Sequence, residues 1–381
     1  MKKQHWMGII AGILFASSAN GQIGRLEWHS SFELPSTQRG KSHLGLAGAI
    51  AGVTDGVLLI GGGANFPDLP PWDGGSKKIQ HDVFVYKKEG RKLSLLTQDR
   101  MPEGLAYGAS LGLPRGLLVI GGETSKGKTS SCRLLKFDAH AKKIALVDYP
   151  DLPFPMANMG ATYIGDKIFV AGGECQDGVS DQVLQLDLQD LASGWIQVGT
   201  LPYAVSHLQL VADNLNRLYV VGGRKANNDR PSTLYPGLMR SSDGGNQWTK
   251  LRDIPFNAAA GVACILPDNG LWLLSADRGD TFNRVEHFIF EAKNEPDPDK
   301  AQQLIHAKNQ LQVNHPGFGQ EIWRYDLKLE KWNKMGQLPS DGPVTTTAVI
   351  WDDMVVIPSG EIKAGIRSPQ ILVATFFLNR L

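Results

Sequence analysis

Runs of apolar residues that end in glycine recur along this chain at a nearly regular interval. Four runs end in a glycine pair: VLLIGG at 57–62, LLVIGG at 117–122, IFVAGG at 168–173 and LYVVGG at 218–223. Two further copies have lost the pair, LWLLSA at 271–276 and MVVIPSG at 354–360. Because strands buried on both faces read as continuous runs of Val, Ile and Leu, the pattern predicts six copies of one strand-rich unit.

A second marker runs in phase with the first. A hydrophobic residue followed by proline closes each unit, at Pro35, Pro102, Pro153, Pro202, Pro255 and Pro339, and a tryptophan precedes four of these prolines, at Trp28, Trp195, Trp248 and Trp332. A further apolar strand lies between the markers, as in VFVY at 83–86 and IWRYD at 322–326. A period near 50 residues with these signals is typical of the Kelch repeat.

The predicted fold is therefore all-β, a six-bladed Kelch-type β-propeller over residues 22–381. One blade cannot bury its own faces, so the blades must stack into a ring. The glycine runs are expected to be the inner strands, ending near a crowded axis where a Cβ would clash or φ must be positive. Residues 23–28 precede every glycine run, and we expect them to supply the outer strand of the last blade and so close the ring.

One blade carries a long insertion at about 278–320. Its polar part is expected to be helical at 299–309, which makes the insertion in the fifth blade partly helical. A long loop in a compact domain is usually a lid or a binding element. A solvated excursion without function is the alternative.

The first 21 residues have the features of a signal peptide. Lys2 and Lys3 precede an apolar stretch at 6–15, and small residues follow at 17–21. The stretch is too short to span a bilayer comfortably, although an uncleaved anchor remains the alternative. The sequence thus predicts a periplasmic protein with no membrane association after cleavage.

Charge and cysteine content exclude several classes of function. The chain has 39 Lys and Arg against 38 Asp and Glu, a net charge of +1, which argues against a nucleic-acid partner. The three cysteines, Cys132, Cys175 and Cys264, form no metal or redox pair. They are expected to be small buried hydrophobes, with one disulfide left open by an oxidising compartment. The nine histidines form no close ligand pair, so no metal and no organic cofactor is expected.

Charged residues follow the glycine runs, where loops converge on the mouth of the propeller channel. The first residues of these loops are Asn65 and Phe66, Glu123, Glu174, Arg224, Asp277 with Arg278, and Glu361. Such a ring suits a polar, anionic ligand. It suits equally a structural network in which Glu and Arg pair across the mouth.

The segment PSGEIKAGIRSP at 358–369 resembles the N-acetylneuraminate epimerase (sialic acid mutarotase) family. The resemblance extends to AYG at 106–108, IGGET at 120–124 and the lysine-rich strand entry within 61–86, and so covers most of the mature chain. It implies a proton-accepting role for Glu361, with Arg367 as its neighbour. The blade with Glu361 comes last here, which is similar to the cyclically permuted mutarotase subfamily, and Ser275-Ala276 departs from the expected glycine pair.

The resemblance thus implies an isomerase that interconverts the α and β anomers of N-acetylneuraminate by acid–base ring opening and closure. Glu361 would act as the base and Arg367 would orient the sugar carboxylate. Glu123, Arg224, Asn65 and Lys78 are further candidates for substrate binding. The expected partner is a small acidic sugar, and the oligomeric state, a homodimer included, is left open.

Three rival functions remain at this point. Residues 241–248, SSDGGNQW, match the hairpin motif called the Asp box that occurs in sialidase propellers. A sialidase would need three arginines and a tyrosine nucleophile, and a copper-radical oxidase would need a Cys–Tyr cross-link with histidine ligands. A Kelch propeller that only binds carbohydrate or protein is the third alternative, since fold does not fix function.

Overall fold

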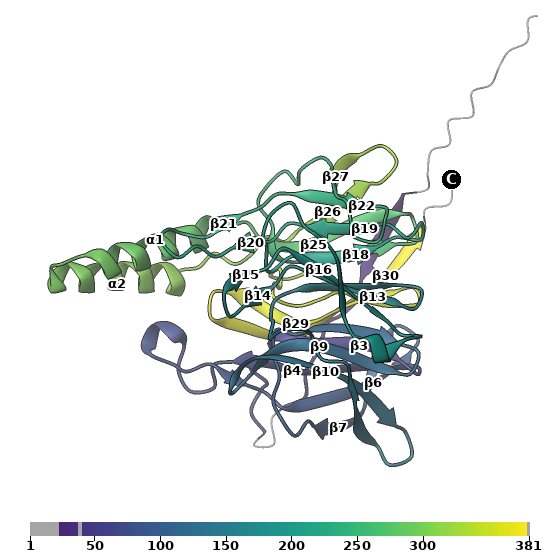
Figure 1. The fold of residues 1–381 in the computed structure, drawn as a ribbon. Helices are drawn as coiled ribbons and strands as arrows, with labels where there is room; N and C mark the ends of the chain where they lie inside the picture. Colours follow the sequence, from purple (N-terminus) through teal and green to yellow (C-terminus); the bar gives the residue numbers. More distant parts are fainter. Residues whose placement is uncertain (1–22, 37–39, 379–381) are drawn as a thin grey trace, which may run out of the picture.

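The computed structural model describes residues 23–36 and 40–378, and it is a propeller of six blades viewed edge-on in Figure 1. The predicted signal peptide, residues 1–21, lies outside the described residues. None of the helices in the described ranges is long and apolar enough to cross a membrane.

Each blade is an antiparallel sheet of four main strands. The first blade contains β3 (Ala47–Thr54), β4 (Val57–Asn65), β6 (Asp82–Glu89) and β7 (Lys92–Arg100), with β5 (Lys78–Ile79) paired to β4. The second contains β8 (Ala109–Leu113), β9 (Gly116–Thr124), β10 (Gly127–Asp138) and β11 (Lys143–Tyr149). The third contains β12 (Gly160–Ile164), β13 (Lys167–Ala171), β16 (Gln182–Asp187) and β17 (Ile196–Thr200), and carries the hairpin β14 (Glu174–Cys175) and β15 (Gly178–Val179).

The remaining three blades follow the same plan. The fourth contains β18 (Gln209–Ala212), β19 (Leu218–Val221), β22 (Leu238–Ser241) and β23 (Thr249–Lys250), with the hairpin β20 (Arg224–Lys225) and β21 (Thr233–Leu234). The fifth contains β24 (Ala259–Leu266), β25 (Gly270–Asp277), β26 (Glu321–Asp326) and β27 (Lys331–Gln337). The sixth contains β28 (Val349–Trp351), β29 (Met354–Lys363), β30 (Ile366–Leu378) and β1 (Gly24–Trp28), and β2 (Phe32–Glu33) also pairs with β30. Two short 3₁₀ helices, η1 (Pro71–Asp73) and η2 (Leu191–Ser193), lie in loops.

The ring closes as the sequence predicted. Strand β1 pairs antiparallel with β30, with Gly24 opposite Leu378 and Trp28 opposite Ala374. The two ends of the described chain therefore lie side by side in the last blade. This closure leaves the sixth blade with the same four strands as the others and removes a free edge from the ring.

The prediction that the glycine strands are innermost was wrong. They are second from the axis, and the innermost strands are β3, β8, β12, β18, β24 and β28, which line the central channel. Neighbouring innermost strands contact one another around the axis, and several are rich in glycine and alanine, as in AGAIAGVT of β3. Six strands converge at the axis, so only small side chains fit along much of their length.

The glycine pairs join neighbouring blades. In four blades the last glycine of the run, which is the third one in the first blade, has a positive φ, and its N–H donates to a carbonyl of the next blade: Gly63 to Leu105 (2.8 Å), Gly122 to Met156 (2.7 Å), Gly173 to Val205 (2.9 Å) and Gly223 to Ala258 (2.7 Å). A Cβ on the first glycine, for example Gly222, would collide with the same carbonyl. Where the pair is lost, serine hydroxyls take over, because Ser275 donates to the carbonyl of Pro343 and Ser359 accepts from the N–H of Leu46.

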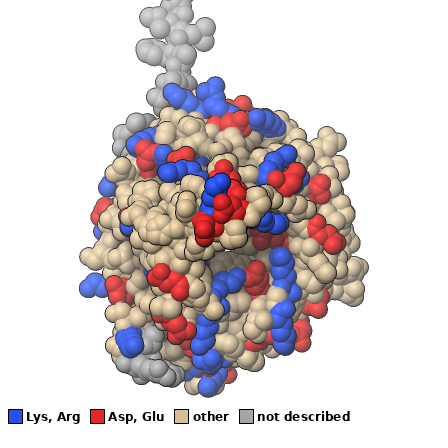
Figure 2. Space-filling model, turned by 90° about the vertical axis from the view of Figure 1, so that its left-hand side faces the viewer, with Lys and Arg blue, Asp and Glu red and all other residues tan. Residues whose placement is uncertain are grey.

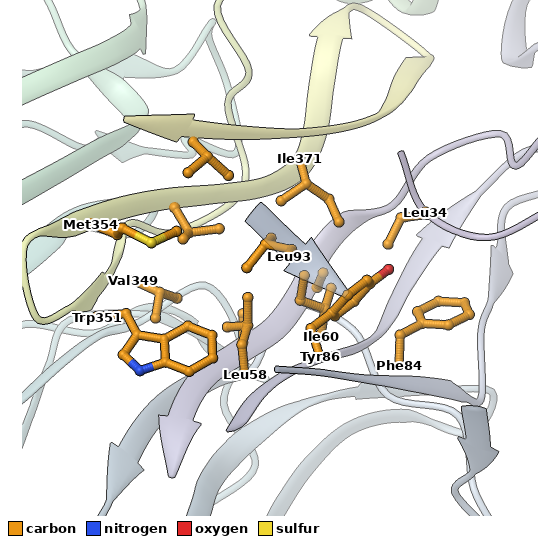
Figure 3. Close-up of a cluster of buried hydrophobic side chains, with 14 of the residues drawn as sticks. Leu34, Leu58, Ile60, Phe84, Tyr86, Leu93, Val349, Trp351, Met354 and Ile371 are labelled. Carbon is orange, nitrogen blue, oxygen red and sulfur yellow. The ribbon is translucent and has the colours of Figure 1, made fainter. Parts of the chain in front are cut away.

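Hydrophobic cores fill the spaces between adjacent blades. Figure 3 shows the core where the last blade meets the first, with Val349, Trp351 and Met354 facing Leu58 and Ile60. All of these side chains are buried. Packing of this core therefore depends on the closure of the ring, since it is built from the two ends of the chain.

The insertion in the fifth blade contains two helices rather than one. Helix α1 (Asp280–Asn294) precedes α2 (Pro298–Val313), and the pair projects from the propeller face (Figure 1). The sequence predicted helix only at 299–309, within α2. The helices are tied to two other blades, because Glu286 accepts hydrogen bonds from the N–H and hydroxyl of Ser232, and the amide of Asn309 donates to the carbonyl of Trp72.

Candidate active site

A closed ring of six backbone hydrogen bonds surrounds the propeller axis. It is formed by one residue at or shortly before the start of each innermost strand, and the six are Gly48, Tyr107, Asn158, His207, Ala260 and Thr345, here called the inner ring. Each N–H donates to the carbonyl of its counterpart in the preceding blade, at 2.7 to 2.9 Å, and Gly48 completes the circle by donating to Thr345. All six have φ between 50° and 64°, a left-handed conformation that is rare for residues other than glycine and asparagine.

The charged side chains form a second ring around the first. In each blade, the residue just before the inner-ring member pairs with a residue at the end of the next strand, as Ala106 does with Glu123. The six residues paired in this way are called the outer ring, and they are Ala64, Glu123, Glu174, Arg224, Asp277 and Glu361. Figure 2 looks onto this face, where acidic and basic side chains surround a hollow beside the helical projection. Five of the six outer-ring positions thus bring a charge to the channel mouth, as the loop pattern predicted.

Below the inner ring, the innermost strands enclose a cavity of about 350 Å³. Its described lining contains no Asp, Glu, Lys or Arg, and consists largely of small and apolar residues. Acid–base chemistry on a charged sugar needs titratable groups. The candidate site is therefore the charged mouth above the inner ring, rather than the channel below it.

Glu361 and Arg367 lie together at the mouth, on the paired strands β29 and β30. The guanidinium NH1 of Arg367 is 3.6 Å from Oε1 of Glu361, and the side chains are only 7% and 19% exposed. The N–H of Gly365 donates to the same carboxylate oxygen at 2.7 Å, and the guanidinium stacks on the Phe66 ring at 4.6 Å. Nε and NH1 of Arg367 are buried without a hydrogen-bond partner among the described residues, so this arginine has unused donors for an anion.

The second blade adds a wall next to this pair. Lys77 lies over the ring of Tyr107 at 4.7 Å, and its ammonium is 2.7 Å from the carboxylate of Glu123. Burial raises the pKa of Tyr107, and the charges of Lys77 and Arg367 oppose that rise. Tyr107 therefore stays a neutral hydroxyl, able to donate or accept a hydrogen bond at the mouth.

The third and fourth blades place a tightly connected cluster on the mouth. Glu174 accepts from the amide of Asn158 at 3.1 Å and from the hydroxyl of Ser206 at 3.3 Å, and lies 3.7 Å from the guanidinium of Arg224. Nε of Arg224 donates to Nδ1 of His207 at 3.3 Å. Burial, and then the charge of Arg224, lower the pKa of His207 well below its usual value, so this imidazole is neutral at pH 7.

Helix α1 contributes to the same side of the mouth. The ring of Phe282 lies 4.7 Å from the guanidinium of Arg224. The insertion therefore supplies part of the wall of the mouth. Arg278 is paired differently, since it stacks on Phe256 at 4.2 Å and binds the carboxylate of Glu321.

Asp277 lies in the fifth blade at the outer-ring position. Burial raises the pKa of its carboxyl to about 6, opposed by the N–H of Gly279 and the charge of Arg224 and reinforced by the charges of Glu361 and Asp280. The N–H of Gly279 donates to Oδ1 at 2.8 Å. Among the described carboxyl groups at the mouth, Asp277 thus shows a clear upward shift of the pKa.

Two of the predicted binding residues occupy other places. The side chain of Asn65 is 5% exposed, and it donates to the carbonyl of Gly45 at 3.0 Å and accepts from Gln80 at 2.8 Å. It therefore holds the β4 loop in shape. Lys78 is exposed in β5, and the preceding residue, Lys77, is the lysine that reaches the mouth. Glu123, Arg224, Glu361 and Arg367 all belong to the mouth.

Sequence reasoning did not select Tyr107, Asn158, His207 or Asp277 as site residues. The first three precede innermost strands that carry no glycine marker, and Asp277 follows the copy in which Ser-Ala replaces Gly-Gly. The signal that could have found them is positional. Once the glycine runs are aligned, the residue after each run and the residue before each preceding strand recur in every blade.

The features behind the rival functions lie away from the mouth. The Asp box is the turn between β22 and β23, where the hydroxyl of Ser241 accepts from Gly245 N–H and Asp243 accepts from Gln247 N–H. It is a hairpin turn, as its sequence indicated.

The three cysteines are unpaired. Cys132 and Cys264 are buried, and burial raises the pKa of each thiol to about 12, so both are inert. Cys175 is only partly buried.

Fold and mouth define this chain as a six-bladed Kelch-type propeller with an acid and guanidinium site at one end of its channel. The family model described as N-acetylneuraminate epimerase matches residues 8–144 and 149–380, and the chain belongs to that family.

Individual relatives are distant. An N-acetylneuraminate epimerase of Haemophilus influenzae (strain 86-028NP) is 25% identical over 247 residues, which are 64% of this chain and 63% of the relative. One from Brucella suis is 34% identical over 131 residues, 32% of this chain and 33% of the relative. A Kelch domain-containing protein of Vibrio cholerae is 25% identical over 222 residues, 58% of this chain and 61% of the relative. The matches thus span less than two thirds of these relatives' length.

The solved structure of YjhT is similar in fold. It superimposes with a TM-score of 0.61 at 17% sequence identity, covering 90% of this chain and 99% of YjhT. At this identity the similarity bears on the fold alone, and it agrees with the propeller described above.

Proposed function

We propose that this protein is a mutarotase for N-acetylneuraminate or a closely related acidic sugar, interconverting its two anomers. The observation that carries the proposal is the close pair of Glu361 and Arg367 side chains at the mouth. A carboxylate at the mouth lies beside a buried guanidinium whose Nε and NH1 have no hydrogen-bond partner in the described part of the chain. Membership of the N-acetylneuraminate epimerase family supports the choice of sugar.

The proposed chemistry divides between the two residues. Arg367 binds the carboxylate of the sugar, because its planar fork can donate two parallel hydrogen bonds. This fixes the anomeric centre near Glu361. The Glu361 carboxylate then removes the proton of the anomeric hydroxyl, the bond between the anomeric carbon and the ring oxygen breaks as that oxygen takes up a proton, and an open hydroxyketone forms. Rotation and reclosure on the other face give the second anomer.

The surroundings of Glu361 suit a base. The N–H of Gly365 donates to one oxygen of the carboxylate, and Arg367 lies next to that same oxygen. No hydrogen bond within the described chain uses Oε2. The second oxygen is thus available to a substrate hydroxyl.

The proposal is tested by exchange NMR on pure N-acetylneuraminate, with and without protein. The wild type is expected to accelerate exchange between the anomers. Glu361→Gln is expected to fold normally and to lose a hundredfold or more of that acceleration, the usual contribution of a general base. Glu89→Gln, an exposed substitution in β6, is the matched control.

Three outcomes would contradict the proposal. Wild-type rates in Glu361→Gln would remove the assignment of the base. Binding of the sugar without faster exchange would favour a noncatalytic module, and release of the sugar from a glycoside would favour a sialidase.

A further inference from the structure

We propose that Asp277 is the second acid–base group of this site, the one that protonates the ring oxygen while Glu361 takes the hydroxyl proton. The inference rests on the proposed function and deepens it. Ring opening needs an acid as well as a base, and the Glu361–Arg367 pair supplies only the base and the anion site.

The two carboxyl groups occupy equivalent positions in adjacent blades. Asp277 of the fifth blade pairs with Ala259, and Glu361 of the sixth pairs with Val344. The next residues, Ala260 and Thr345, are joined by an inner-ring hydrogen bond of 2.8 Å. Asp277 and Glu361 therefore lie next to the two residues that form one hydrogen bond of the inner ring. They are close enough to each other that the charge of Glu361 raises the pKa of Asp277.

The inner-ring side chains beside these two groups are small. The members in the fifth and sixth blades are Ala260 and Thr345, whereas Tyr107, Asn158 and His207 in the second to fourth blades are larger. Asn158 and His207 are in addition held by Glu174 and Arg224. The step between Asp277 and Glu361 thus carries no bulky inner-ring side chain.

The surroundings of the two carboxyl groups differ in the way that the chemistry needs. Glu361 has a guanidinium and an N–H donor on its carboxylate. Asp277 is desolvated and faces the charges of Glu361 and Asp280, with Arg224 and the N–H of Gly279 opposing them. Two carboxyl groups in contrasting environments can share the work of acid and base.

The proton balance closes without a co-reactant. In the forward step the hydroxyl proton goes to Glu361, the ring bond breaks as the ketone forms, and the proton of Asp277 goes to the departing ring oxygen. After rotation about the bond next to the ketone, Asp277 takes that proton back as the hydroxyl attacks the other face. Glu361 returns its proton to the new anomeric hydroxyl, so both groups end as they began.

The experiment is the pH profile of anomer exchange in the wild type and in Asp277→Asn. The wild type is expected to show a bell whose falling limb marks the loss of the proton of Asp277. Asp277→Asn is expected to lower kcat a hundredfold or more and to lose the falling limb. Asp299→Asn, an exposed carboxyl in α2 of the same insertion, is the matched control and should keep the wild-type profile.

The outcomes separate this inference from the proposed function. If Asp277→Asn keeps the wild-type rate and both limbs of the profile, the role of Asp277 is overturned and the mutarotase proposal stands. If the wild type itself does not accelerate exchange, both fall. Carbon NMR of the aspartate carboxyls without sugar gives an independent reading, and titration of Asp277 at the position of an exposed aspartate would also overturn its role.

Discussion

At the scale of single residues, Asp277 shows how a functional position lowers stability. Burial raises its pKa to about 6, whereas an unfolded chain gives aspartate a pKa of about 3.9. Below the lower value the carboxyl is neutral in both states and has no effect. Above the higher value it is charged in both, and the folded state carries a disfavoured charge. The destabilisation therefore develops as the pH rises from about 4 to about 6.

Asp277→Asn is thus expected to raise the free energy of unfolding at pH 8. The gain is up to about 3 kcal/mol, because the pKa of the wild-type carboxyl is about two units higher in the folded protein than in the unfolded chain. The gain should shrink towards pH 4, because the wild-type carboxyl becomes neutral there. Urea unfolding of both proteins at pH 8 and pH 4.5 measures the difference. A variant that is equally or less stable than the wild type at pH 8 would show that the carboxyl is not disfavoured in its ionised form.

At the scale of elements, the closing strand depends on a buried ion pair in the neighbouring blade. Asp268 and Arg324 are 0% and 3% exposed, and Nε of Arg324 is 2.6 Å from Oδ2 of Asp268. The same oxygen accepts the N–H of Gly24 at 3.1 Å, and Oδ1 accepts from Trp272 at 3.1 Å. The carboxylate thus joins β1 of the sixth blade to β25 and β26 of the fifth.

Asp268→Ala is expected to lower the free energy of unfolding by about 3 to 5 kcal/mol, since it leaves a buried guanidinium without its main partner. Replacing both Asp268 and Arg324 by leucine should cost less, because no charge is then buried. Denaturant unfolding compares these variants with Glu27→Gln in the exposed pair of Glu27 and Arg25, where a change within 0.5 kcal/mol is expected. Equal losses from Asp268→Ala and Glu27→Gln would contradict the joining role of Asp268.

The sequence predicted the elements unevenly, and the reason is physical. Strands such as β4 and β9 are buried on both faces and so produce long apolar runs that are easily recognised. The innermost strands escaped notice because several are short and all line a narrow channel, as in β18 with four residues and β28 with three. Helix α1 was missed as well, since its single buried residue, Val285, gives little apolar pattern.

At the scale of the whole molecule, the number of blades and the closure were predictable, but the geometry of the mouth was not. Six repeats and an unpaired first strand indicate a closed ring from sequence alone. The inner ring has no such signature, because Tyr107, Ala260 and Thr345 are residue types that rarely adopt positive φ. Their conformation follows from hydrogen bonds between blades, which exist only once all six are assembled.

The closed ring also predicts where the chain can be reopened. The last blade takes three strands from the C-terminal end of the chain and its fourth, β1, from the N-terminal end. Gly24 lies opposite Leu378, so a short turn could join them. Cutting instead at Gly90, in the turn between β6 and β7, would divide the first blade in the same way. Its strand β7 would come from the new N-terminal end, and β3, β4 and β6 would come from the new C-terminal end.

A circular permutant that links Leu378 to Gly24 and begins after Gly90 is therefore expected to fold and to keep the activity of the wild type, with a Tm within a few degrees. Every blade retains its four strands, and no hydrogen bond of the inner ring is cut. A permutant opened at Val119, buried in the middle of β9, is the matched control and should fail to fold. Circular dichroism and thermal unfolding compare the two. If both permutants fold, or if both fail to fold, the prediction is contradicted. The stability of the ring would then not depend on keeping the buried strands of each blade uncut.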